Sequence, residues 1–397
     1  MTRPDVQHEG FDPARLSRID TWMQSYVNER KYPGSSVLVA RHGKEAYFHA
    51  TGMRNVEAGL PFARDTLVRI YSMTKPVTTV AAMMLAERGL FHLDAPVSDF
   101  IPAFGDCRAL IPGAERIDQT QPCATPTLHQ LMTHTSGLEY EIWNADLLRW
   151  YRATGHPLVT SGKRAALAMP LASDPGTRWG YGPSTDWLGQ VVEAVDGRRI
   201  DAFCRDELFA PLGMPDTAFE PDGLEDRLAT VSRRTGDGGF AAMPMGPPRA
   251  PEFYGMGHAL YSTAPDYLRF LRMVLNGGAL DGQRVLSPEA VRTMSTDQMR
   301  GLTLIPMVSA DPRVSADLPL APGPAPTHTA AFVRTETDVA GKRHAGSLGW
   351  AGICNTHYWI DPKAGIAAVL MTQSLPFLEP GMVRLYGAFE RAVYAGL

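Results

Sequence analysis

A serine and a lysine three residues apart, Ser72 and Lys75, stand at the head of an apolar stretch and could together perform nucleophilic chemistry. No charged residue occurs from 77 to 86, and a helix that is apolar on every side is a buried helix. Pro76 is compatible with this helix only in its first turn, so the helix should start near Ser72. Residues three apart share one face of a helix. The spacing therefore predicts a lysine within side-chain reach of a serine at the start of a buried helix.

This placement would give both side chains unusual properties. Burial and the positive end of the helix dipole both disfavour a charged amine, so Lys75 is expected to accept a proton near neutral pH. The N–H groups at the helix start would stabilise an oxyanion next to Ser72. The plainer alternative is a serine that caps the helix and a lysine that extends to solvent. Partners elsewhere in the chain must decide between the two.

One candidate partner is Tyr181, in a Gly/Pro-rich turn just before a helix that we expect to begin near Ser184. We expect this tyrosine to face a cleft, where a nearby cation such as Lys75 would make its phenolate accessible. The alternative is an ordinary aromatic anchor of the loop.

The two ends of the chain predict the elements that position these residues. Residues 11–31 have helical periodicity, and 35–52 contain two runs of strand-forming residues joined by a short turn. Near the C-terminus, 356–373 form a second predicted hairpin and 382–397 a closing helix. The expected fold is α+β, with a mostly antiparallel sheet built from both ends of the chain and flanked by terminal helices.

The middle of the chain differs, because short helical segments alternate there with Gly and Pro breaks. We expect an all-helical domain, 91–279, inserted into a discontinuous sheet domain, 1–90 and 280–397, with the active site in the cleft between them. Two Pro/Gly-rich tracts, 234–257 and 304–340, are expected to be long loops that form lids or pocket walls.

Composition excludes several classes of protein. The formal charge is −4 without a basic run, which argues against nucleic acid, and neither a secretory signal nor a membrane span is evident. Cys107, Cys123, Cys204 and Cys354 form no CxxC pair, which favours reduced thiols and a cytoplasmic protein. His129 and His134 lack a third metal ligand, and His134 is expected to make structural hydrogen bonds. Without a nucleotide-binding motif or a metal motif, no cofactor is expected. The sequence does not determine the oligomeric state.

Six blocks occur in an order and at separations that resemble a known family. They are YSMTKPVT, LDAPVSDFIP, LMTHTSGL, DPGTRWGYGPSTDWLG, PLGMPDTAF and HAGSLGWAGICNTHYWID, over about residues 70–361. The chain resembles the serine β-lactamase and penicillin-recognising enzyme superfamily, in particular the family VIII carboxylesterases on the class C β-lactamase fold.

The resemblance implies a role for each matching position. Ser72 would be the nucleophile, Lys75 the helix lysine and Tyr181 the tyrosine of the Y-x-N motif. Trp350, Ala351 and Gly352 would replace K-T-G as substrate-binding residues, and the N–H groups of Ser72 and Ile353 would form the oxyanion hole. A rival for the K-T-G position is His344-Ala345-Gly346.

Two departures from the lactamase pattern favour esters as substrates. Pro183 stands in place of the asparagine of Y-x-N, and Trp350 in place of the lysine of K-T-G. Loss of an amide and of a carboxylate-binding cation should weaken selection of β-lactams and D-amino-acid peptides.

The expected function is hydrolysis of short-chain carboxylic esters, as small-molecule substrates, through an acyl-enzyme intermediate, with weak β-lactamase activity at most. Lys75 and Tyr181 would act as a coupled pair, and which of them is the base stays open. An acyltransferase, a β-lactamase or D-peptidase, and a non-catalytic binding protein are the alternatives. The intact Ser72, Lys75 and Tyr181 argue against the last, and the absence of a G-x-S-x-G motif argues against an α/β-hydrolase.

Overall fold

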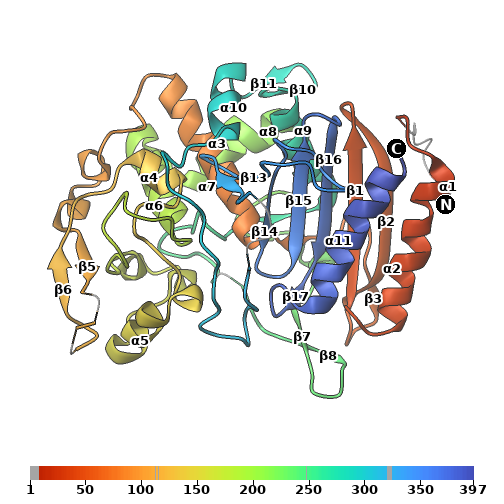
Figure 1. Cartoon of the computed structure of the whole chain (residues 1–397), viewed down its shortest axis with the longest axis horizontal. Helices are drawn as coiled ribbons and strands as arrows, with labels where there is room; N and C mark the ends of the chain where they lie inside the picture. The colour runs from red at the N-terminus through yellow and green to blue at the C-terminus, as the bar shows by residue number, and fades with distance from the viewer. Residues whose placement is uncertain (1–8, 112, 115, 247, 320–323) are drawn as a thin grey trace.

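The computed structural model describes residues 9–111, 113–114, 116–246, 248–319 and 324–397 (Figure 1). Within these residues, eight strands form the main sheet in the order β12-β13-β14-β15-β16-β1-β2-β3, and each neighbouring pair is antiparallel. Their bounds are β1 (Gly34–Arg41), β2 (Lys44–Asn55), β3 (Leu60–Pro61), β12 (Thr327–His328), β13 (Val333–Arg334), β14 (Leu348–Gly352), β15 (Thr356–Asp361) and β16 (Ile366–Thr372). The antiparallel sheet predicted from the sequence is confirmed.

The two ends of the chain meet in this sheet, as the sequence predicts. β1 pairs with β16, so that Val39 lies opposite Ala368, and β1 and β2 form the expected hairpin. His42 and Gly43 in the hairpin turn have φ values of 50° and 80°, as a two-residue turn with the twist of the strands requires.

Both faces of the sheet are covered, which explains the continuous apolar run of β1. Val37 and Val39 point to the face packed by α1 (Pro13–Leu16), α2 (Arg18–Asn28) and α11 (Pro380–Ala395). Leu38 and Ala40 point to the opposite face, where α9 (Ala264–Leu275) lies against β1 and β16. Successive strand residues alternate between faces, so a strand covered on both sides is apolar at consecutive positions, here residues 37–40.

The predicted buried helix is present and carries the candidate nucleophile. A 3-10 turn, η1 (Tyr71–Met73), leads into α3 (Thr74–Glu87), and Pro76 lies in the first turn of α3. All residues from 74 to 85 are buried. Helix α3 packs against α6 (Ser184–Asp196) in the core of the molecule.

The middle of the chain is largely helical but also contains short strands. Its helices are α4 (Leu128–Met132), α5 (Ala145–Thr154), α6, α7 (Ile200–Cys204), a π-helical turn η7 (Arg205–Phe209) and α8 (Ala210–Leu212), and α10 (Pro288–Ser295) lies beyond α9. The short strands are β5 (Arg108–Leu110) with β6 (Thr120–Pro122), β7 (Ser232–Arg234) with β8 (Phe240–Ala242) and β17 (Ser374–Leu375), β9 (Tyr261–Ser262) with β4 (Val68–Arg69), and, past α9, β10 (Ala279–Leu280) with β11 (Gln283–Arg284).

The expectation of an all-helical insertion therefore needs correction. β7 pairs with β17, and β9 with β4, so that extended segments join the insertion to the rest of the chain. The domain boundaries at 91 and 279 stay a prediction. Of the two predicted loops, residues 247 and 320–323 lie outside the described residues, and the lid role of both loops also stays a prediction. No helix among the described residues is long and apolar enough to cross a membrane.

Candidate active site

The side chains of Ser72 and Lys75 meet at the start of α3, as their spacing predicts. Lys75 is 4% exposed, and its Nζ lies 3.3 Å from Ser72 Oγ, 3.1 Å from Tyr140 Oη and 2.9 Å from the carbonyl oxygen of Gly257. An ammonium group can donate to all three oxygens. A neutral amine can donate to two of them and accept from the serine hydroxyl through its lone pair. The geometry therefore suits transfer of a proton from Ser72 to Lys75.

Tyr140 is the residue at this site that the sequence analysis missed. It follows the LMTHTSGL block, and its backbone N–H donates to the Tyr181 carbonyl at 3.0 Å. A Cβ atom at Gly180 or Gly182 would collide with residues 138–139, so these glycines let the two loops touch. The rings of Tyr140 and Tyr181 are consequently 5.6 Å apart. In the sequence, Gly180 and Gly182 on both sides of Tyr181 were the feature that could have indicated this close approach.

The environment of Tyr140 keeps its phenol protonated at neutral pH. Burial raises the pKa of Tyr140 well above its usual value of 10, and the negative charge of Asp186 raises it further. The Tyr140 hydroxyl therefore accepts a hydrogen bond from Lys75 and keeps its own proton for donation.

Tyr181 lies beside Lys75 but is not open to a cleft, which corrects the expectation. It is 4% exposed, and the Lys75 amine lies 4.8 Å from its ring centroid. Its hydroxyl accepts a 2.9 Å hydrogen bond from Trp350 Nε1. The rings of Trp143, Trp179, His134 and Trp350 surround it. Three of these aromatic residues come from other segments of the chain, so the turn sequence alone could not reveal the burial.

The end of β14 reaches the turn that carries the nucleophile. A Cβ atom at Gly352 would collide with the carbonyl oxygen of Ile70, so only glycine permits this approach. Tyr71, directly before Ser72, has a φ of 44°, a conformation that is costly for a bulky residue. Its ring is buried with Ile353 and Cys354 in one apolar cluster. The two peptides expected to form the oxyanion hole are thus held in neighbouring segments.

Asn355 fixes the turn that contains Ile353. Its backbone N–H donates to the Gly352 carbonyl at 2.9 Å, and its φ is 63°. Its side-chain amide donates to the carbonyls of Ser374 and Pro376 at 2.8 and 2.9 Å. The oxyanion role of the Ser72 and Ile353 N–H groups stays a prediction.

The structure distinguishes the two candidates for the K-T-G position. Trp350 lies on β14, donates a hydrogen bond to Tyr181 and lines the same small cavity as Lys75. The rival residue His344 lies before β14, in the segment that leads into this strand. Its Nδ1 is 2.8 Å from a carboxylate oxygen of Asp361. A cavity of about 620 Å³ adjoins Trp350 and Ala351, with Val333, Phe377 and Val383 among its walls. This arrangement suits Trp350 and Ala351 as substrate contacts, a role that the geometry leaves as a prediction.

Two buried histidines lie behind Tyr181. The His134 ring is 4.8 Å from the Tyr181 ring and 5.3 Å from the His328 ring. Burial lowers the pKa of His328 to about 4, and burial with the nearby His328 and Lys75 charges lowers the pKa of His134 well below its usual value. His134 Nδ1 has no hydrogen-bond partner among the described residues, and its ring packs against those of Tyr181 and His328. Its carbonyl accepts from Gly180 N–H at 2.8 Å.

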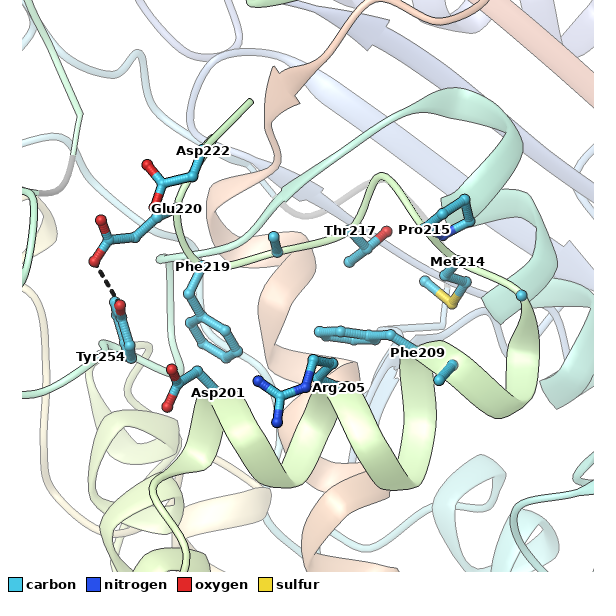
Figure 2. Close-up of a pocket in the computed structure, with 13 residues that line it drawn as sticks. Asp201, Arg205, Phe209, Met214, Pro215, Thr217, Phe219, Glu220, Asp222 and Tyr254 are labelled. Atoms are coloured by element: carbon cyan, nitrogen blue, oxygen red, sulfur yellow. Dashed lines mark hydrogen bonds between the residues drawn. The ribbon is translucent and has the colours of Figure 1, made fainter. Parts of the chain in front are cut away.

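A larger cavity lies away from Ser72 and contains none of the predicted site residues. It has a volume of about 740 Å³, between the helical segment 200–212 and the loop 214–222 (Figure 2). Figure 2 shows Phe209 and Phe219 in its walls and the hydrogen bond from the Tyr254 hydroxyl to Glu220. Among the described residues, no group of three or more His, Cys, Asp or Glu side chains is placed to hold a metal ion, and all four cysteines are free.

The fold and the Ser-x-x-Lys helix define the class of protein. The family model described as Beta-lactamase matches residues 19–392, and the chain belongs to this family. This assignment confirms the resemblance found in the sequence.

Individual relatives extend the match over the whole chain. Esterase EstB from Burkholderia gladioli is 30% identical over 100% of both chains. Monacolin J acid methylbutanoyltransferase from Aspergillus terreus is 31% identical, over 97% of this chain and 96% of the relative. The solved structure of simvastatin synthase (LovD) from the same fungus, in its LovD6 mutant form, has a TM-score of 0.81 at 27% identity, with 97% of this chain and 98% of that chain covered.

Proposed function

We propose that this protein is a serine hydrolase that cleaves short-chain carboxylic esters through an acyl-enzyme intermediate, as a carboxylesterase of the beta-lactamase family. The observation that carries the proposal is the buried Lys75 amine, 3.3 Å from Ser72 Oγ and bound on its other sides by neutral oxygen atoms. The name of Esterase EstB, which matches the full length of the chain, supports the same reaction class. Trp350 in place of a lysine favours an uncharged substrate group at that position.

The reaction begins with proton transfer from Ser72 to Lys75. As the proton moves to Nζ, Oγ forms a bond to the ester carbonyl carbon and the carbonyl electron pair moves to oxygen. The N–H groups of Ser72 and Ile353 are proposed to hold this oxyanion, a contribution of about 3–4 kcal/mol per donor in comparable sites. The ester C–O bond then breaks and leaves the acyl group on Ser72.

The departing alcohol needs a proton, and two phenols stand next to Lys75. Tyr181 contacts the amine with its ring, and Tyr140 accepts a direct hydrogen bond from it. We propose that the proton returns from Lys75 through these phenols to the alcohol. The same groups then remove a proton from the water that releases the acid.

The first test is substitution of the nucleophile. Ser72→Ala should lower the hydrolysis rate of a short-chain aryl ester by at least about 10³-fold, because the covalent intermediate cannot form. Ser25→Ala, on α2 across the sheet, is a matched control and should keep full rate. Mass spectrometry of the wild-type protein with a slow ester should show one acyl group on Ser72. Unchanged hydrolysis by Ser72→Ala would exclude this site.

Acyl transfer is the second candidate, supported by the relative named as a methylbutanoyltransferase. The same acyl-enzyme would then pass its acyl group to an alcohol in place of water. Addition of an acceptor alcohol during turnover separates the two, since a transferase forms a new ester while a hydrolase releases the free acid. Rapid turnover of a chromogenic cephalosporin would instead favour the β-lactamase alternative.

A further inference from the structure

A buried carboxylate, that of Asp186, borders Gly257, the residue whose carbonyl accepts a hydrogen bond from Lys75. Asp186, in the first turn of α6, has an exposed fraction of 0%. Its Oδ1 accepts a hydrogen bond from the Gly257 N–H at 3.2 Å, whereas Oδ2 has no donor among the described residues. A buried carboxylate is costly unless it is paired or fully hydrogen-bonded. The position of Asp186 therefore requires compensation by a nearby positive charge.

The segment 255–258 connects this carboxylate to Lys75. A Cβ atom at Gly257 would collide with Asp186 Oδ2 and closely approach Tyr140 Oη, so both oxygens border the space that the glycine leaves empty. The carbonyl oxygen of Gly257 accepts the 2.9 Å hydrogen bond from Lys75. Thr78 in α3 donates to the Met256 carbonyl at 2.5 Å and holds the segment against the helix. The Gly257 residue thus binds the carboxylate through its N–H and the amine through its carbonyl.

Few other charges face this cluster. His258 Nδ1 lies 3.4 Å from Asp186 Oδ1, from the same segment as Gly257. The titratable groups around Lys75 from the other elements are Tyr140, Tyr181, His134 and His328. Burial lowers the pKa of both His134 and His328, so these rings stay neutral at neutral pH. Lys75 and His258 are therefore the groups that can balance Asp186.

We propose that Asp186 is a positioning residue for the reaction at Ser72: its carboxylate holds the Gly257 peptide against Lys75 and balances the ammonium that forms when Lys75 takes the serine proton. This inference rests on the proposed function. The serine proton resides on Lys75 and leaves with the alcohol, so that no further proton acceptor is required.

The direction of the effect follows from the sign of the charge. A nearby anion favours the ammonium form of Lys75, so loss of the Asp186 charge makes Lys75 give up its proton at lower pH. The acidic limb of the rate profile is the pH range over which the rate falls as the pH is lowered. Asp186→Asn should therefore move this limb to lower pH. The plateau rate should fall by about 10- to 100-fold, because the ammonium formed in the reaction loses its counter-charge. A purely structural role would lower the plateau and leave the limb in place.

The experiment measures two reactions of the full-length chain between about pH 5 and pH 9. One is hydrolysis of a short-chain aryl ester, and the other is phosphonylation of Ser72 by a fluorophosphonate probe, which needs only an activated serine. The matched control is Asp266→Asn, since Asp266 is also a buried aspartate in the first turn of a helix but binds the 216–217 turn. We expect the acidic limb to move for Asp186→Asn in both reactions and to stay unchanged for Asp266→Asn.

The outcomes separate this inference from the function on which it rests. If the probe labels the wild type but the acidic limb of the Asp186→Asn profile does not move, the role of Asp186 is overturned and the serine nucleophile stands. A wild type that neither reacts with the probe nor hydrolyses esters overturns both. If circular dichroism shows that Asp186→Asn does not fold, Asp186→Ala with and without added formate takes its place. Return of the limb toward the wild-type position with formate supports the inference, and no response to formate opposes it.

Discussion

The two sides of Lys75 are built in different ways. On one side, Tyr140 and Gly257 bring oxygen atoms to the amine, and Asp186 in turn binds the Gly257 N–H. On the other, Tyr181 and Trp350 present aromatic rings, with His134 and His328 packed behind them. We call these the polar side and the aromatic side of Lys75.

This difference suggests a division of labour. Groups on the polar side exchange hydrogen bonds with the amine, so they can control where its proton goes. Groups on the aromatic side exclude water and shape the space next to the nucleophile, which strengthens electrostatic effects inside. Changes on the polar side should therefore alter the chemical step, and changes on the aromatic side should alter stability and substrate fit.

The largest effect expected from this comparison is that of Tyr140→Phe. It removes the only phenol that bonds directly to Lys75 in the described structure, so kcat should fall by about 10²–10⁴-fold, the usual contribution of a positioned acid or base. Steady-state kinetics with a short-chain aryl ester measures this loss.

The matched variant on the aromatic side is Tyr181→Phe, which retains the ring near Lys75 but loses the hydroxyl that accepts from Trp350. We expect a smaller fall in kcat than for Tyr140→Phe. The reverse order would make Tyr181 rather than Tyr140 the main carrier of the returning proton and contradict the proposed division between the two sides.

A second expected effect concerns acid stability on the aromatic side. The pKa of His328 is about 4 in the folded protein because of burial, against about 6.5 for an unfolded histidine. The folded state thus binds this proton less tightly, so the stabilisation is present above pH 6.5 and is lost as the pH falls through 4. Urea unfolding of the wild type near pH 4 should show a free energy of unfolding lowered by about 2–3 kcal/mol through this group, relative to its value above pH 6.5. The variant His328→Gln should lack this part of the pH dependence.

The control for this measurement is His92→Gln, which changes an exposed histidine and should leave the pH dependence of unfolding unaltered. Identical pH profiles for wild type and His328→Gln would show that His328 is not held neutral by burial.

The smallest expected effect is that of Trp350→Phe. The variant retains an aromatic ring but loses the Nε1–H donor to Tyr181, which is worth about 1 kcal/mol, or roughly fivefold in kcat/KM. Trp179→Phe is the packing comparison, because Trp179 Nε1 has no hydrogen-bond partner among the described residues. If both variants lose the same activity, ring packing and not the hydrogen bond is what Trp350 supplies.

The sequence predicted those parts of the molecule that depend on local periodicity. The hairpins, the terminal helices and the buried helix α3 follow from alternation, apolar runs and one constrained proline. The contact between Ser72 and Lys75 follows from their spacing of three on that helix. For these features, neighbours in the sequence determine neighbours in space.

The polar side of Lys75 could not be predicted in this way. Tyr140 is 65 residues from Lys75 in the sequence, and Gly257 is 182 residues away. Both come from loops, whose mutual approach depends on the absence of side chains at glycines such as Gly180 and Gly182. The same holds for Tyr181, because the rings that cover it come from distant segments such as Trp350. Periodicity carries no information about where two loops meet.

The pairing of β1 with β16 has a consequence for how the chain is made. On the ribosome, the N-terminal hairpin emerges more than 300 residues before its partner, since Ser35 pairs with Thr372. Until then one edge of β1 lacks its hydrogen-bonding neighbour, and an unpaired apolar strand edge invites association with other chains. Completion of the sheet, and with it of the site at Ser72, therefore waits until β16 has been made, so that termination before residue 366 should yield aggregation rather than a partly active enzyme.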